Sequence, residues 1–184
     1  MTETIKLILL VIATNAISLM MWRLIFFNNE FKKSPLNFFK GFFLFTCNTF
    51  FTIVLYSKVQ GLGLAVNLSY MLCLEWISLR DIKDKTITNK SNMLLLFLGL
   101  VCLLSNGVPF REIGFNLMIA GVILILGIII RVISRKQIGG GDIKMLVALA
   151  VRFNIIEMIK IIIISIFTGA IYASYLLIFK KKEK

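Results

Sequence analysis

The sequence predicts an all-α fold, a polytopic membrane bundle of about seven (six to seven) transmembrane helices. Apolar residues make up 59% of the 184 residues, and the mean hydropathy is +0.92. A soluble domain of this length cannot bury so much apolar surface, so lipid must act as part of the solvent. Because no internal repeat or low-complexity linker interrupts the chain, we expect residues 1–184 to form a single integral membrane domain.

Seven apolar runs are the candidate helices. They cover residues 5–22, 41–57, 61–79, 92–104, 114–133, 142–153 and 158–179. The first run could be a secretory signal peptide. However, it continues into Met21, Trp22 and Arg23 rather than into a small-residue cleavage site, so we expect it to be retained as a helix.

Two of the runs are too short to cross a bilayer. At about 1.5 Å per residue, the run 142–153 would be roughly 18 Å long, whereas the hydrocarbon core measures about 30 Å. The run 92–104 is similarly short. We therefore expect a water-reachable recess at one membrane face, around the two acidic residues that lie near these runs, Asp81 and Asp142.

The basic residues indicate how the chain is oriented. The formal net charge is +12, which in a soluble protein would suggest nucleic acid, but here the basic residues lie mostly between apolar runs and no nucleic-acid partner is expected. Alternating loops place sixteen basic residues on one side and five on the other, namely Lys6, Lys58, Arg111, Arg152 and Lys160. The positive-inside rule then predicts a multi-pass protein of the plasma membrane, with its N-terminus outside and its C-terminus in the cytoplasm. Asp81 and Asp142 would both face the cytoplasm, and the basic loops would contact anionic lipids of the bilayer.

Metal and disulfide chemistry are not indicated. The three cysteines, Cys47, Cys73 and Cys102, are widely spaced within apolar runs, and the sequence has no histidine. These residues form neither a zinc-binding pattern nor a disulfide framework. We expect no metal and no cofactor.

Two polar segments stand out between the apolar runs. The first reads Asp-Ile-Lys-Asp-Lys-Thr-Ile-Thr-Asn from Asp81 to Asn89, and the second reads Gly-Gly-Gly-Asp from Gly139 to Asp142. Three successive glycines allow another backbone to approach closely. Each aspartate also has a simpler explanation: Asp142 could be a helix N-cap, and Asp81 could form an i,i+4 ion pair with Lys85. Asp84 is interpreted as an exposed loop charge that pairs with Arg80.

Together, the two segments resemble the type IV prepilin peptidase and preflagellin peptidase family, which are GxGD intramembrane aspartyl proteases. The resemblance covers a peptidase core at residues 61–179. Asp81, Ile87 and Asn89 match the first family element, although Thr88 stands where the family usually has proline. The second element is matched by Gly139, Gly141, Asp142 and Lys144. Residues 23–40 contain no cysteine, so the chain is similar to a minimal form that lacks the cysteine-containing insertion, and methyltransferase activity is not expected.

The resemblance implies an endopeptidase that removes the basic leader from a prepilin-like (pilin, pseudopilin or archaellin-like) membrane protein at the cytoplasmic face. Asp81 and Asp142 would be catalytic. Two close carboxylates cannot both ionise cheaply, so one would stay protonated while the other activates water. The supporting residues would be Gly139, Gly141, Lys144, Ile87 and Asn89. The specific pilin and the oligomeric state are left open.

A third acid, Glu75, lies within an apolar run. It could support the site or meet the substrate, or it could have a hydrogen-bonded structural role. The alternative function is a non-catalytic membrane assembly component, or a small transporter that binds protons or cations at Glu75, Asp81 and Asp142. A transporter would be expected to place its acids at mid-membrane and to contain broken or repeated helices. Here two of the three acids lie toward one face.

Overall fold

All seven apolar runs form helices, as predicted. The computed structural model describes residues 3–26, 35–59, 61–135 and 139–180, with side chains except at 26, 35–45, 172, 173 and 175–180. Every regular element in these ranges is an α-helix. The helices are α1 (Glu3–Phe26), α2 (Pro35–Lys58), α3 (Gly61–Asp84), α4 (Asn89–Ser105), α5 (Phe110–Ile133), α6 (Gly140–Arg152) and α7 (Ile155–Lys180).

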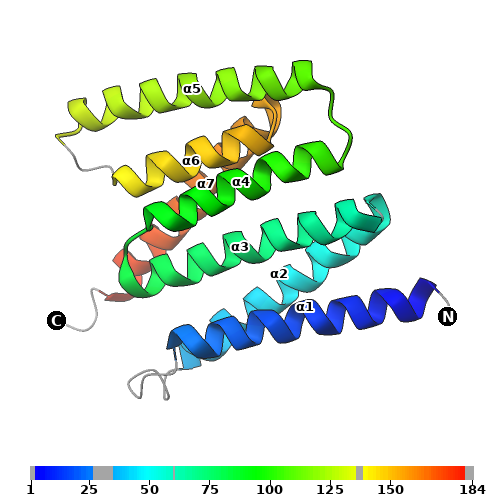
Figure 1. The fold of residues 1–184 in the computed structure, drawn as a ribbon. Coiled ribbons are helices and arrows are strands. Elements are labelled where there is room, and N and C mark those ends of the chain that lie inside the picture. Colours follow the sequence, from blue (N-terminus) through cyan, green and yellow to red (C-terminus); the bar gives the residue numbers. More distant parts are fainter. Residues whose placement is uncertain (1–2, 27–34, 60, 136–138, 181–184) are drawn as a thin grey trace.

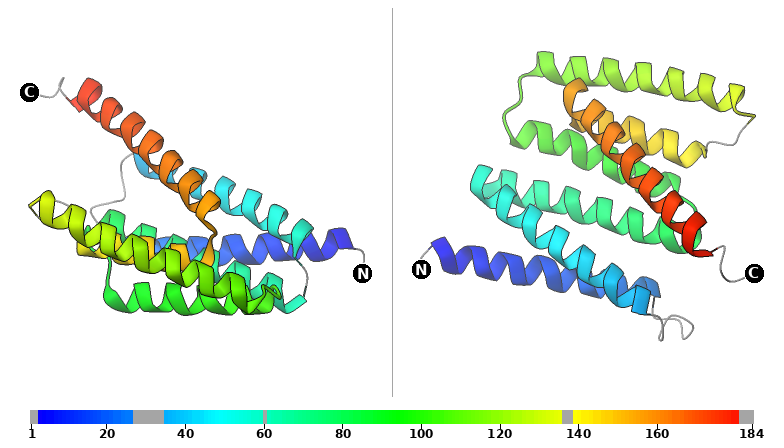
Figure 2. Two further views of the ribbon diagram at one scale, coloured as in Figure 1. Left: turned by 90° about the horizontal axis from the view of Figure 1, so that it is seen from above. Right: turned by 180° about the vertical axis from the view of Figure 1, so that it is seen from behind.

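Five helices lie side by side in one layer, in the order α1, α3, α4, α6, α5 (Figure 1). The helices α2 and α7 cross the same face of this layer (Figure 2). Because α4 packs against both α3 and α6, it separates the two helices that carry the candidate catalytic aspartates. The end of α3 and the starts of α4 and α6 lie at one end of the layer (Figure 1).

Within the part of the chain that the structure describes, three helices are long and apolar enough to span a bilayer. These segments are Glu3–Ile25, Gly61–Asp84 and Phe110–Ile133, and Asn89–Ser105 is a shorter apolar helix. Large apolar side chains such as Ile12 on α1 and Ile125 on α5 are exposed. In water such surfaces would be costly, whereas lipid solvates them.

The layer is tightly packed where α4 lies between α3 and α6. The core there includes Tyr70 from α3, Leu95 from α4 and Ala148 from α6, all buried. A Cβ atom added at Gly99 of α4 would lie 3.4 Å from Cβ of Arg152 and 3.5 Å from Cε2 of Tyr70. Small residues permit this close approach, which supplies van der Waals contact between membrane helices.

Polar side chains join the helices at several depths. Asn15 of α1 donates to Thr49 of α2 through Nδ2, at 2.9 Å. At the end of the layer opposite the aspartates, Arg152 of α6 donates to Oδ1 of Asn67 at 2.8 Å, and Nδ2 of Asn67 donates to Oδ1 of Asn106 at 3.1 Å. Such interhelical hydrogen bonds satisfy groups that lipid cannot.

The helices extend beyond the apolar runs. The third run was expected to end at residue 79, but α3 continues through Asp84, so Asp81 and Asp84 are helical rather than loop residues. Backbone hydrogen bonding continues across polar residues, and hydropathy alone does not detect it. The helix α6 has 13 residues, about 20 Å, and α4 has 17, so both are short, as expected.

Candidate active site

Asp81 lies in the last turn of α3, where its side chain is half-buried. The backbone N–H of Lys85 donates to the carbonyl of Asp81 at 2.8 Å, and Lys85 has a φ of 51°. This left-handed residue ends the helix. No Asp81–Lys85 ion pair is present among the described side chains, so the simpler explanation of Asp81 is wrong. The expected pair between Arg80 and Asp84 is present, with Nε and Oδ2 3.5 Å apart.

The chain after Asp81 turns directly into α4. Thr88 is the N-cap of this helix, and its Oγ1 accepts a hydrogen bond from the backbone N–H of Ser91 at 3.3 Å. A side-chain cap of this kind satisfies one of the free donors at a helix start. Thr88 therefore fixes the start of α4 by capping, at the position where the family usually has proline.

Asp142 is the third residue of α6 and is exposed. The N-cap of α6 is Gly139, which makes no side-chain cap hydrogen bond, so the interpretation of Asp142 as the N-cap is wrong. The carboxylate instead lies over Gly139, because a Cβ atom added there would be 2.7 Å from Oδ2 of Asp142. The absence of a side chain at residue 139 thus makes room for this carboxylate.

The two polar segments meet at Gly141. A Cβ atom added to Gly141 would lie 3.1 Å from Cβ of Ile87 and 3.2 Å from its carbonyl oxygen. Nδ2 of Asn92 donates to the carbonyl of Gly141 at 3.3 Å, and Nζ of Lys144 donates to Oδ1 of Asn89 at 2.7 Å. The structure therefore brings together four of the predicted supporting residues. It also adds Asn92, which the sequence analysis did not single out. The signal that could have found it is a polar asparagine within an apolar run.

The two aspartates are placed at the same end of the layer but are not joined directly. Among the described residues, no hydrogen bond connects Asp81 with Asp142. Their segments are connected through α4, whose first turns contact α6 and whose preceding loop follows α3. Catalytic groups in an empty site are often farther apart than in the substrate complex, so this arrangement is compatible with a pair that closes around a water and a peptide bond.

A family comparison agrees with this geometry. The model of the type IV leader peptidase family matches residues 68–174, more than half of the chain, including both aspartate segments. The chain belongs to the type IV leader peptidase family. Together with the three long apolar helices, this membership makes it a membrane peptidase. It supports the peptidase hypothesis over the transporter. No curated protein and no solved structure matches the sequence.

Glu75 of this leader peptidase lies on α3 and is half-buried against α1. Its Oε1 accepts a hydrogen bond from the hydroxyl of Ser18, whose side chain is buried. This bond joins α3 to α1, whereas Asp81 lies in the last turn of the same helix. The contact favours the structural interpretation of Glu75 over a role in the site.

A double-mutant cycle on Ser18 and Glu75 would test this role. We expect Glu75→Gln to retain both the fold and peptidase activity, because the amide oxygen still accepts from Ser18. Glu75→Leu should lower stability by about 0.6–2 kcal/mol, and much of that loss should be absent in a Ser18→Ala background. Thermal unfolding in detergent measures both effects. Loss of cleavage by a folded Glu75→Gln variant would instead place Glu75 in the reaction.

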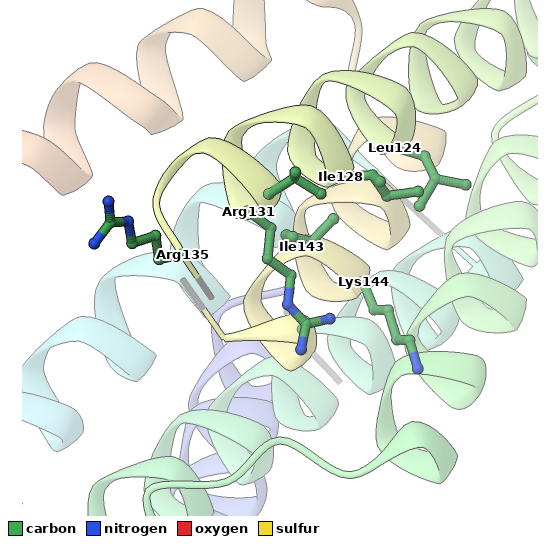
Figure 3. Close-up of a pocket in the computed structure, with 8 residues that line it drawn as sticks. Leu124, Ile128, Arg131, Arg135, Ile143 and Lys144 are labelled. Carbon is green, nitrogen blue, oxygen red and sulfur yellow. The ribbon is translucent and has the colours of Figure 1, made fainter. Parts of the chain in front are cut away.

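A groove flanks the first turn of α6 on its α5 side (Figure 3). Its volume is about 770 Å³. The lining residues are Leu124, Ile128, Arg131, Val132, Arg135, Gly140, Ile143 and Lys144. A recess was expected around both aspartates, but this groove is lined by neither. The groove and the two aspartate segments of the leader peptidase therefore both lie beside the first turn of α6.

Proposed function

We propose that this leader peptidase is an aspartyl endopeptidase that removes a basic leader from prepilin-like membrane proteins, using Asp81 and Asp142. The observation that carries the proposal is the contact of Gly141 with Ile87, which holds the turn containing Asp142 against the chain that follows Asp81. The two carboxylates come from segments 61 positions apart in sequence. A structural cap or a surface ion pair would not require these segments to meet.

The proposed reaction is hydrolysis with a water molecule as the nucleophile. The ionised aspartate takes a proton from the water molecule while the water oxygen bonds to the peptide carbonyl carbon. The protonated aspartate donates to the developing oxyanion. In the breakdown step the aspartate that took up the water proton passes it to the amide nitrogen as the C–N bond breaks, and the other aspartate regains its proton from the hydroxyl as the carbonyl reforms. The products are the leader carboxylate and the new amino terminus, so no cofactor is consumed.

The glycine run fits a substrate that binds in extended form. Peptide bonds in a helix are already hydrogen-bonded and hard to attack, so the scissile segment must unwind. Gly139 and Asp142 are both exposed, and the space that a side chain at residue 139 would fill is occupied by the Asp142 carboxylate. A peptide strand can therefore approach the carboxylate closely.

The orientation in the membrane follows from charge. Alternating the seven apolar runs assigns sixteen of the 21 basic residues to the side that also holds both aspartates. We propose that this side faces the cytoplasm of the plasma membrane, where a short basic leader preceding an apolar helix would be exposed. Single cysteines at residues 81 and 142 should react with a reagent that reaches the cytoplasmic side. Labelling only from outside would reverse the orientation.

Cleavage of a defined substrate tests the function. The protein would be reconstituted in liposomes with a synthetic precursor that has a basic leader, a glycine at the junction and an apolar helix. We expect mass spectrometry to detect leader loss at a single junction. The matched control precursor keeps the same leader and the same helix but separates them by a spacer, and it should remain intact. Equal cleavage of both precursors, or of neither, would contradict the assignment.

A further inference from the structure

The groove beside α6 combines a cationic rim with an apolar wall. Its cations are Arg131 from the last turn of α5, Arg135 directly after the C-cap of that helix, and Lys144 from α6. None of its lining residues that the structure describes is acidic. At about 770 Å³, the groove lies within the range of roughly 300–1,000 Å³ typical of small-molecule sites.

The cations of the rim are available to bind an anion. Neither Arg131 nor Arg135 forms an ion pair with any described acidic side chain. The guanidinium of Arg131 lies over Gly140, since a Cβ atom added there would be 2.7 Å from Nη1. Lys144 uses one N–H on Asn89, which leaves two donors. Figure 3 shows Arg131 and Lys144 extending to the same side of the α6 start.

The remaining wall suits a hydrocarbon chain. It consists of Leu124, Ile128 and Val132, one stripe of α5, together with Ile143 of α6. The stripe is exposed on a helix long enough to span a bilayer. Continuing along α5, the groove therefore passes from charged to apolar, which matches a molecule with an anionic head and an acyl tail.

We propose that this groove is a binding site for an anionic phospholipid, with its phosphate held by Arg131 and Lys144, with Arg135 adding positive charge at the rim, and with an acyl chain along α5. Arginine suits this role because its planar guanidinium can bind phosphate through two parallel hydrogen bonds. Basic pockets between membrane helices are a recognised mode of binding anionic headgroups. A basic leader is the wrong occupant, since three cations would repel it.

Lipid counting by native mass spectrometry tests the proposal without requiring peptidase activity. The full-length protein would be taken from nanodiscs containing phosphatidylglycerol and phosphatidylcholine. We expect wild type to retain phosphatidylglycerol in preference to phosphatidylcholine. Arg131→Gln with Arg135→Gln should weaken this retention roughly 10- to 30-fold, from the loss of two charges near the headgroup.

Two control variants make the result decisive. Arg111→Gln removes one charge at the opposite end of α5 and should leave phosphatidylglycerol retention unchanged. Arg131→Lys with Arg135→Lys keeps the charge and should retain most of the binding, which separates lost affinity from misfolding. The proposal is overturned if the glutamine variant retains phosphatidylglycerol like wild type. It is also overturned if that variant loses binding of the precursor peptide while its lipid retention is unchanged.

Discussion

Leader removal should fall by about 10³-fold or more in Asp81→Asn and in Asp142→Asn, with each variant folded and inserted as wild type. Asparagine has nearly the same shape as aspartate but can neither take a proton from water nor donate one as an acid. Because the two carboxylates act in one step, the double variant should be no slower than either single variant. The rate is measured with the liposome assay, using single-turnover mixing.

Asp84→Asn is the matched control for this loss. It removes an exposed carboxylate from the same turn of α3. Asp84 pairs with Arg80 there, and surface pairs of this kind contribute little. We expect cleavage within about twofold of wild type. If both catalytic-site variants still remove the leader, the two-aspartate mechanism is refuted even though the family membership stands.

Gly141→Ala should lower cleavage by about 10- to 100-fold. The added methyl group would lie 3.1 Å from Cβ of Ile87 and 3.2 Å from its carbonyl oxygen, and backbone cannot swing aside as a side-chain tip can. The chain after Asp81 must therefore move away from the turn that holds Asp142. Displacements of about 1 Å in a site can cost on the order of 10²-fold in rate.

Two further glycines separate this effect from general destabilisation. Gly121→Ala on α5 meets nothing within 4 Å, so it should leave activity unchanged and raise helix stability by up to about 1 kcal/mol. In Gly139→Ala the new methyl group would be 2.7 Å from Oδ2 of Asp142, a flexible group, so activity should fall with little loss of stability. If Gly141→Ala cleaves at the wild-type rate, the contact between Gly141 and Ile87 does not position the two aspartates for catalysis.

The helices could be predicted because each apolar run is local in sequence. Their ends could not, since hydropathy stops at Leu79 whereas backbone hydrogen bonds carry α3 on to Asp84. The two motifs also contain the residues that meet, including Gly141 and Ile87. What joins the segments depends on how the helices are rotated against each other, and no local pattern encodes that rotation.

Several contacts illustrate the difference between what a local pattern predicts and what helix packing decides. Asn92 reaches the carbonyl of Gly141 across 49 positions of sequence. Glu75 is satisfied by Ser18, on a helix outside the family match. In each case a polar residue in an apolar run signalled that a partner exists. Only the packed structure shows which partner it is.

The close packing at Gly99 has a consequence for how the sequence can diverge. Gly99 lies about 15 Å along α4 from Asn89, yet it sets how near α4 comes to both α3 and α6. An alanine there would make ordinary contacts at 3.4 and 3.5 Å, but a longer side chain would press against Arg152 and Tyr70 and wedge the two aspartate-bearing helices apart. We therefore expect selection for peptidase activity to hold position 99 small across homologues, while neighbouring lipid-facing positions such as Phe97 drift freely among apolar residues.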